Sequence, residues 1–428
     1  MSPTTRAPRL LPALVQRWWL LGRLRAVPGP TRLLLLTQLA FNVGFYLVLP
    51  FLAVHLAQDL MLAGWAVGLV LGVRTFSQQG LFALGGALAD RFGTRPAVLA
   101  GCALRVTGFA ILALAGDLWS VLVGAVLTGL AGALFSPAVE AALAEQGAGL
   151  ERRGTITRSE LFALFAVCGE VGAVAGPLLG ALLLRVDFAL VCLVAAGAFV
   201  LIGLAHVRWL PRSAPRHATE PVLAGWSEVL GNRVFWLFAL CYSGYLLSHN
   251  QLYLALPAEL QRAGHPWALG WLFALASLLV VLGQLPMADW ARARLGPRRA
   301  LPLGFALLSA AFAVVALDVW AAPGWGALTP AVSMVVLLTF GQMLAVPTAQ
   351  DLVADLAAER RLGAHFGFLS SVGGLAVLVG GAGVGHLLDG FGALPWVVLA
   401  GVPALGGAAL WLLIGRVREG HPVPDSEQ

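Results

Sequence analysis

The sequence contains no lysine and few charged residues of any kind. Asp, Glu and Arg together make up 11% of its 428 residues, all 27 basic residues are arginine, and 59% of the residues are hydrophobic. The mean hydropathy is +0.85. A globular protein of this length needs far more polar surface. The composition therefore excludes a water-soluble domain and predicts an integral membrane protein.

Cysteine and the usual catalytic groupings are also scarce. The four cysteines each lie inside an apolar run, and no cysteine or histidine spacing matches a metal site or a disulfide framework. No nucleophile paired with a base and no phosphate-binding glycine loop is present. The sequence thus argues against an enzyme and predicts no metal and no cofactor, with energy drawn from an ion gradient.

Apolar runs long enough to cross a bilayer, about 20 residues each, recur along the whole chain. Strand-like alternation is absent, so the expected fold class is an all-α membrane protein with twelve transmembrane helices. The predicted spans are 33–57, 65–89, 97–116, 119–143, 159–185, 188–209, 234–257, 267–288, 299–320, 328–354, 364–388 and 393–415.

The placement of arginine predicts the topology. The N-terminal segment and the connections after the second, fourth, sixth, eighth and tenth spans are rich in arginine, whereas only Arg185 and Arg262 lie on the other side. By the positive-inside rule, both termini are expected in the cytoplasm. The net charge of +6 then reflects topology and requires no nucleic-acid partner. Asp59, Asp117 and Asp389 fall in the outer loops, where they are expected to be solvated.

The two halves of the chain repeat one another. Glu151-Arg152-Arg153 before the fifth span recurs as Glu359-Arg360-Arg361 before the eleventh. Two pseudo-symmetric six-helix bundles with a site between them describe a secondary transporter. The predicted domains are a basic N-terminal segment 1–32, bundles 33–209 and 233–416, a cytoplasmic linker 210–232 and a tail 417–428.

The segment Gly86-Ala-Leu-Ala-Asp90-Arg91-Phe-Gly93-Thr-Arg95 joins the second and third spans and is expected to form a tight cytoplasmic turn. It matches the signature loop G-x-x-x-D-R-x-G-x-R of the major facilitator superfamily at every defined position, and the chain resembles that family over essentially its full length. The resemblance implies that Asp90, Arg91 and Arg95 pin the inner ends of the two bundles together. Asp289 lies in a worn second copy of this loop, and Glu140 and Asp351 near inner helix ends are expected to join the same inner gate.

The fifth span resembles the antiporter motif of drug exporters in this superfamily. It carries Gly172-x-x-x-Gly176-Pro177-x-x-Gly180, although ordinary small-residue packing gives the same pattern. The stretch Leu71 to Gly80 is similar to twelve-helix bacterial multidrug-resistance exporters of the drug–proton antiporter type. One departure is that the fourth span lacks the arginine of the R-x-x-Q-G pattern, having Ala125-x-x-Thr128-Gly129 instead. Either the proton-coupling group lies elsewhere, or the protein does something other than proton-driven export.

Three charged residues lie deep in the predicted spans, where each is costly unless paired or facing water. They are Arg74, Arg105 and Glu170, and Glu170 is the acid nearest the midplane. Desolvation favours the neutral form of a carboxyl group, and a nearby cation favours the charged form. We therefore expect Glu170 to carry the proton with Arg74 or Arg105 as its partner; the alternative is a permanent salt bridge that only holds helices together.

Uncharged polar side chains in the spans predict a substrate cavity. They are Asn42, Tyr46, Gln78, Gln79, His249, Asn250, Gln251 and Gln342. A cavity of apolar groups, amides and one central acid suits lipophilic or cationic small molecules. The sequence thus predicts a monomeric drug–proton antiporter in a bacterial cytoplasmic (inner) membrane, whose partners are a small-molecule substrate and the lipid bilayer. A proton-coupled importer of a small metabolite and a lipid transporter of the same fold remain alternatives.

Overall fold

The structure, a computed structural model, describes residues 27–210, 226–321, 327–357 and 362–419, and within these ranges it contains helices and no strands. The helices are α2 (Gly29–Gln58), α3 (Gly64–Gln79), α4 (Phe82–Phe92), α5 (Thr94–Leu114), α6 (Leu118–Arg152), α7 (Arg158–Leu183), α8 (Phe188–Trp209), α9 (Trp226–Gly231), α10 (Arg233–Asn250), α11 (Ala255–Arg262), the 3₁₀ turn η1 (Pro266–Ala268), α12 (Leu269–Arg294), α13 (Pro297–Ala321), α14 (Thr329–Leu356), α15 (Leu362–Leu388) and α16 (Leu394–Glu419).

Ten of the described helices are long and apolar enough to cross a membrane without interruption. The two remaining predicted spans, 65–89 and 234–257, are wrong as single helices, because each is broken into two. Counted as α3 with α4 and α10 with α11, they complete twelve membrane-crossing segments. The all-α membrane fold is thus confirmed, with two discontinuous spans that the hydrophobic pattern does not reveal.

The break between α3 and α4 falls at Gly80 and Leu81. The hydroxyl of Ser371 in α15 lies 3.1 Å from the Gly80 carbonyl oxygen and 2.9 Å from the Gly367 carbonyl oxygen of its own helix, so its one proton is shared between the two acceptors. Leu81 adopts φ −109° and ψ 7°, outside the helical range. A side chain from another helix thus takes a carbonyl from the helical ladder, which is a known cause of helix interruption.

The break between α10 and α11 falls at residues 251–254, which form turns. Pro257 has no N–H to bond to the carbonyl of Tyr253 four residues earlier, so a continuous helix would lose a hydrogen bond there. The N–H groups of Ala255 and Leu256 both bond to the Gln251 carbonyl at 2.9 Å instead. This unwound segment places Tyr253 at the centre of the molecule, as described below.

The segment from Gly86 to Arg95 is not a tight turn along its length. Residues up to Phe92 continue α4, and Gly93 alone forms the turn, with φ 90° and ψ 158°. This conformation is easy for glycine and costly for other residues. Asp90 therefore lies in the last turn of a helix, although its side chain is outside the described part of the chain.

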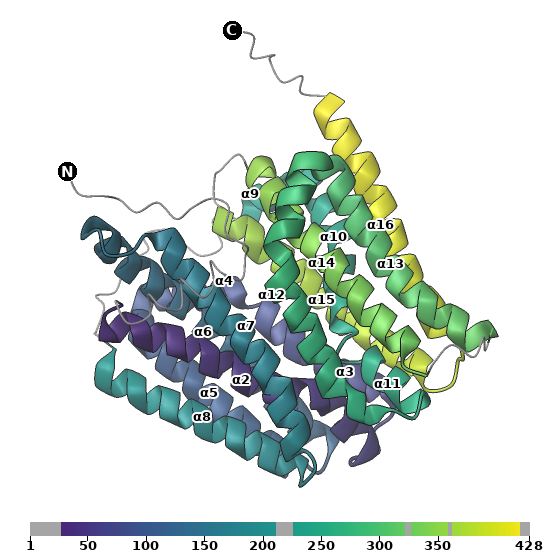
Figure 1. The fold of residues 1–428 in the computed structure, drawn as a ribbon, viewed down its shortest axis with the longest axis horizontal. Coiled ribbons are helices and arrows are strands. Elements are labelled where there is room, and N and C mark those ends of the chain that lie inside the picture. Colours follow the sequence, from purple (N-terminus) through teal and green to yellow (C-terminus); the bar gives the residue numbers. More distant parts are fainter. Residues whose placement is uncertain (1–26, 211–225, 322–326, 358–361, 420–428) are drawn as a thin grey trace.

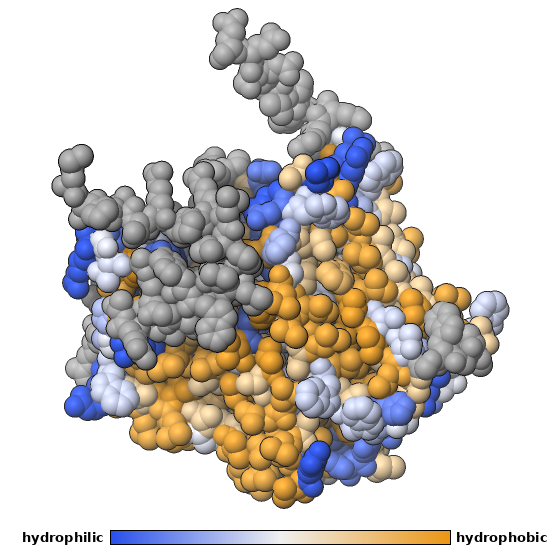
Figure 2. Space-filling view, viewed as in Figure 1, coloured by the Kyte–Doolittle hydropathy of each residue, from blue (hydrophilic) through white to orange (hydrophobic). Residues whose placement is uncertain are grey.

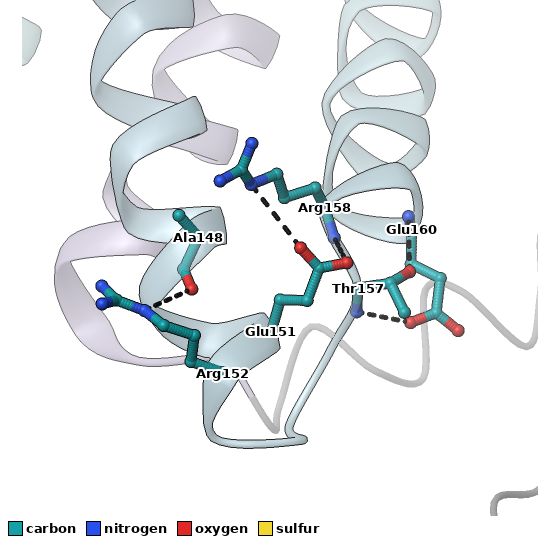
Figure 3. A network of polar contacts seen from close by, with 6 residues as sticks. All are labelled: Ala148, Glu151, Arg152, Thr157, Arg158 and Glu160. Carbon is teal, nitrogen blue, oxygen red and sulfur yellow. Dashed lines mark hydrogen bonds and ion pairs between the residues drawn. The ribbon is translucent and has the colours of Figure 1, made fainter.

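Helix α6 is also longer than predicted, since it continues to Arg152, three turns beyond Glu140. The following loop is fixed at the start of α7, where Thr157 and Glu160 form a capping box with bonds of 3.2 and 2.9 Å (Figure 3). Glu151 joins the two helices through Arg158 at 3.6 Å. The matching loop of the second half, which contains Glu359 to Arg361, lies outside the described residues.

The helices form two groups, α2–α8 and α10–α16 (Figure 1). The axes of the two groups converge toward the side of the view where α3 and α11 lie. We call this the arginine-poor end, since it carries the connections with Arg185 and Arg262, and we call the opposite end, where α2 begins and α16 ends, the arginine-rich end. The main contacts between the groups are α3 with α15 and α7 with α12. Most of the predicted segment 1–32, linker 210–232 and tail 417–428 lies outside the described residues.

Apolar side chains cover the flank of the molecule seen in Figure 2, including the middle of α12. Leu278, Leu282 and Leu285 on α12 are all more than two-fifths exposed. A continuous exposed apolar surface of this kind is what a helix bundle presents to lipid.

Candidate functional site

A small central cavity of about 80 Å³ lies between the two helix groups. Glu170 of α7 and Tyr46 of α2 line it from one group, and His249, Tyr253 and Gln342 line it from the other. The remaining lining residues are Leu252, Phe273, Ala276, Ser277, Val280 and Thr339. The structure brings Glu170, predicted for proton coupling, together with Tyr46, His249 and Gln342, predicted for the substrate cavity, and their roles stay predictions. Sequence reasoning did not single out Ser277 and Thr339.

Tyr46 of α2 and Tyr253, which lies between α10 and α11, bring one phenol from each group to this cavity. Tyr46 interacts electrostatically with both Glu170 and Arg74, and Tyr253 interacts with Arg74. The two phenols therefore share the cavity with Glu170, and both interact electrostatically with Arg74.

Arg74 and Arg105 both contact the Phe45 ring. Their guanidinium carbons are 4.7 and 5.9 Å from its centroid. Arg74 also donates a hydrogen bond to Gln78, one turn further along α3. Two buried cations thus share one aromatic ring, whose faces attract positive charge.

Arg105 is held in a cage of four phenylalanine rings. Besides Phe45, its guanidinium carbon lies 4.8 Å from the Phe41 centroid, 5.7 Å from Phe109 and 5.4 Å from Phe199. Only 1% of the residue is exposed, and its Nε and Nη2 atoms have no hydrogen-bond partner among the described residues. A buried cation satisfied mainly by ring faces is expensive to maintain, which favours a role beyond packing.

The other five predicted cavity residues do not line this cavity, and contacts within and between helices hold them. The Asn42 amide bonds to the Gln38 carbonyl at 2.9 Å, Gln78 binds Arg74, and Gln79 packs against Gly374 of α15. The hydroxyl of Thr75 donates to Asn250 at 3.2 Å. Gln251 is buried and donates to the Leu247 carbonyl at 3.1 Å. Their contact with a substrate stays a prediction.

The motif of α7 serves two different neighbours. Gly172, Gly176 and Gly180 face α2, where an added Cβ at each would lie 2.5 to 2.9 Å from backbone oxygens of α2. Pro177 lacks the N–H that would bond to the Ala173 carbonyl. Ser277 of α12 donates to that carbonyl at 3.2 Å. The glycines thus pack α7 against α2 within its own group. Pro177 leaves the Ala173 carbonyl free to accept a hydrogen bond from the other group.

A ladder of small residues, which we missed in the sequence, joins α3 to α15. An added Cβ on Gly68 would lie 2.0 Å from the Gly381 carbonyl oxygen, and one on Gly385 would lie 2.0 Å from that of Gly64. Gly64, Gly68 and Gly72 recur every four residues, a spacing that is visible in the sequence and typical of close helix packing.

The three outer acids are not simply solvated. Both oxygens of Asp389 accept the Gly64 N–H, at 2.9 and 2.8 Å, and this caps α3 from the other helix group. Asp59 contacts His55 at 2.6 Å. Asp117 caps α6, and the N–H groups of Ser120 and Trp119 hold the pKa of its carboxyl group below the usual value. Each acid satisfies a local donor, and Asp389 also joins the two groups.

Arg262 at the arginine-poor end is held by two acids. Its guanidinium forms a two-pronged contact with Glu259, at 2.8 and 2.7 Å, and reaches Asp318 of α13 at 2.6 Å. The Glu259 side chain is 0% exposed. This cluster was not predicted, because Glu259 follows the end of the expected span.

Among the predicted gate residues whose side chains the structure describes, none meets another across the two groups; the Asp90 side chain lies outside this described set. Glu140, Arg91 and Asp351 are exposed, and Asp289 pairs with Arg292 on its own helix at 2.9 Å. Arg95 donates to the Val207 carbonyl of α8, within its own group. Gly86 packs near Pro137 of α6, again within one group. The inter-group contacts given above lie mainly toward the other end, so within the described part of the chain the arginine-rich end is the more open one.

Comparison with known proteins agrees with this architecture. The family model for the Major Facilitator Superfamily matches residues 34–381 and 252–428. An uncharacterized MFS-type transporter of Mycobacterium tuberculosis is 39% identical over 90% of this chain and 93% of its own length. Multidrug resistance protein MdtH of Photorhabdus laumondii is 32% identical (86% and 90%), and that of Aeromonas hydrophila is 33% identical (89% and 94%).

Solved structures share the fold at low sequence identity. A peptide transporter POT in complex with sulfate gives a TM-score of 0.75 at 18% identity, covering 91% of this chain and 95% of that one. A POT family transporter in complex with 5-aminolevulinic acid gives 0.73 at 13%, covering 92% and 99%. These likenesses show the fold alone. Together with the family model and the relatives, they establish that the chain belongs to the major facilitator superfamily, a family of membrane transporters.

Proposed function

We propose that this transporter exports lipophilic or cationic small molecules by proton antiport, through alternating access of a site between its two helix groups. The observation that carries the proposal is the position of Glu170, a carboxyl group in a cavity whose walls come from both groups. The multidrug resistance proteins among its relatives support the substrate class. Phe273, Leu252 and Val280 supply apolar contact, and a carboxylate favours a cation over an anion.

Glu170 is proposed to carry the proton. A carboxyl group at the interface of two moving halves experiences different desolvation and different neighbours in each state, and both effects change its affinity for a proton. Tyr46 and Tyr253 come from opposite groups and line the same cavity, so movement of the groups would change the electrostatic contacts that relate Glu170 to Arg74. Arg74 and Arg105 are then the fixed cations that favour release of the proton.

The gates follow from the contacts between groups. The glycine ladder of α3 and α15, the Asp389 cap and the Ser277–Ala173 bond close the arginine-poor end. In the opposite state, the proposed closure at the arginine-rich end involves Arg91, Arg95, Glu140, Asp289 and Asp351. With the arginine-rich end in the cytoplasm by the positive-inside rule, the state described is inward-facing. The protein is proposed to work as a monomer in a bacterial cytoplasmic membrane, with both termini inside.

The proposal is tested by a panel of compounds in two assays. A susceptible host producing the wild-type protein should tolerate several lipophilic cations at concentrations at least fourfold higher than a host producing the Glu170→Gln variant at equal abundance. Counterflow of labelled compounds in proteoliposomes then identifies the direction and class of substrate. Uptake of a peptide or an organic acid with no effect of lipophilic cations would instead support an importer, and transfer of a labelled phospholipid would support a lipid transporter.

A further inference from the structure

An apolar groove of about 570 Å³ opens between the two helix groups at the arginine-poor end, apart from the central cavity. Phe51 and Val54 of α2 and Leu178 and Leu182 of α7 form one wall. Trp267 of η1 and Trp271 of α12 form the other. The groove thus bridges the same α7–α12 contact that joins the two groups.

The groove has one charged residue at its rim. Arg185, which directly follows α7, lines it, and no carboxyl group does. Arg185 is exposed and forms no ion pair with the described residues, whereas Arg262, the other arginine of this end, is bound by Glu259 and Asp318. Asp187, two residues away, instead caps α8 through the Ala189 N–H. Arg185 is therefore left available for an anion.

The two tryptophans place the groove at the level of lipid headgroups. Trp267 and Trp271 are 62% and 63% exposed, and exposed tryptophan in a membrane protein concentrates at the interface between hydrocarbon and water. Leu182, which is 57% exposed, lies on the opposite wall, so the mouth of the groove faces the bilayer. An occupant entering there needs an apolar tail and an anionic head at the same depth as Arg185.

We infer that this groove binds an anionic phospholipid of the outer leaflet, with an acyl chain between α2, α7 and α12 and its phosphate on Arg185. The outer position rests on the orientation proposed above. A guanidinium binds phosphate through charge-assisted hydrogen bonds. These bonds increase the affinity for any phospholipid more than they favour an anionic phospholipid over a zwitterionic one. The lipid contacts both groups while the arginine-poor ends are together, so its binding favours the inward-facing state.

Native mass spectrometry of the delipidated protein in detergent tests the inference without a transport assay. We expect phosphatidylglycerol to be retained roughly fivefold more tightly than phosphatidylcholine, and Arg185→Gln to remove most of this preference. Arg208→Gln, an exposed arginine at the opposite end, is the matched control and should leave the preference unchanged. Trp271→Ala should weaken retention of both lipids, because it removes acyl contact and no charge. Melting curves confirm that each variant is folded.

An unchanged preference in Arg185→Gln, or an equal loss in Arg208→Gln, would overturn the inference. Competition by glycerol 3-phosphate alone at similar concentration would also contradict it, since the groove would then bind a free phosphate and no lipid. Absence of drug export by the wild-type protein, with lipid retention intact, would count against the proposed function and leave this site standing.

Discussion

The hydroxyl of Ser277 donates a 3.2 Å hydrogen bond to the carbonyl of Ala173, and this bond joins α12 of one helix group to α7 of the other. The carbonyl is available because Pro177, four residues later, has no N–H to occupy it. Pro177, which belongs to the motif-like segment of α7, thus leaves the Ala173 carbonyl available as an acceptor. That acceptor lies at the interface that must open during transport.

We predict that Ser277→Ala weakens closure of the arginine-poor end by about 1 kcal/mol, the usual net value of one hydrogen bond, which shifts the population of closed molecules about fivefold. Spin labels at Val186 and Trp320, both exposed at that end, report the separation of the groups by pulsed electron resonance. The labels are introduced after replacement of the four native cysteines.

The same substitution made in a Pro177→Ala background supplies the control. An alanine at 177 has an N–H that bonds to the Ala173 carbonyl within α7, so Ser277→Ala should then have almost no further effect. Equal effects in the two backgrounds would show that the proline and the serine act independently.

Gly68 is predicted to tolerate no side chain. In Gly68→Ala, the new Cβ would meet the Gly381 carbonyl oxygen at 2.0 Å, and α3 and α15 would have to separate. Overpacking of this kind costs about 1 to 3 kcal/mol, so the closed population and the transport rate should each fall roughly tenfold. The same label pair and a counterflow assay measure the two quantities.

Gly383→Ala is the matched variant on α15, because an added Cβ there meets nothing within 4 Å. It should transport at the wild-type rate. If both glycine variants behave alike, the ladder is ordinary packing and has no role in closure.

Arg105→Leu is predicted to separate stability from coupling. Leucine fills much of the same volume among the four rings without a buried charge, so the melting temperature should stay level or rise by a few degrees. Proton-coupled transport should be lost, since a fixed cation near the coupling path is gone. A variant that melts well below the wild type and still transports with protons would mean that Arg105 only holds the helices together.

Arg262→Gln is predicted to destabilise the protein by about 2 kcal/mol, because it leaves the buried Glu259 carboxylate without its partner. The expected loss is modest because the Arg262 side chain is 43% exposed and solvent screens its charge. Thermal unfolding in detergent measures the loss. The double variant with Glu259→Gln should recover most of it, and no recovery would show that the pairing is not the source of the stability.

The hydrophobic pattern was sufficient to predict ten helices within a few residues at most of their ends, since length and apolarity alone decide those spans. It could not predict the breaks at Gly80 and at residues 251–254, because these depend on Ser371 from a distant helix and on the missing N–H of Pro257. Glu170 and Tyr46 were found as polar residues deep in apolar runs. Ser277 and Tyr253 gain their places only from the packing of the two groups and from an unwound segment.

The most direct test of the account is proton release driven by substrate in proteoliposomes that contain purified protein and a pH-sensitive dye. The wild type should move protons opposite to a lipophilic cation, and Glu170→Gln should bind the cation and move no protons. Glu160→Gln, on the same helix, retains the capping arrangement of α7 and should behave as the wild type does. Full proton-coupled export by Glu170→Gln would contradict the central claim.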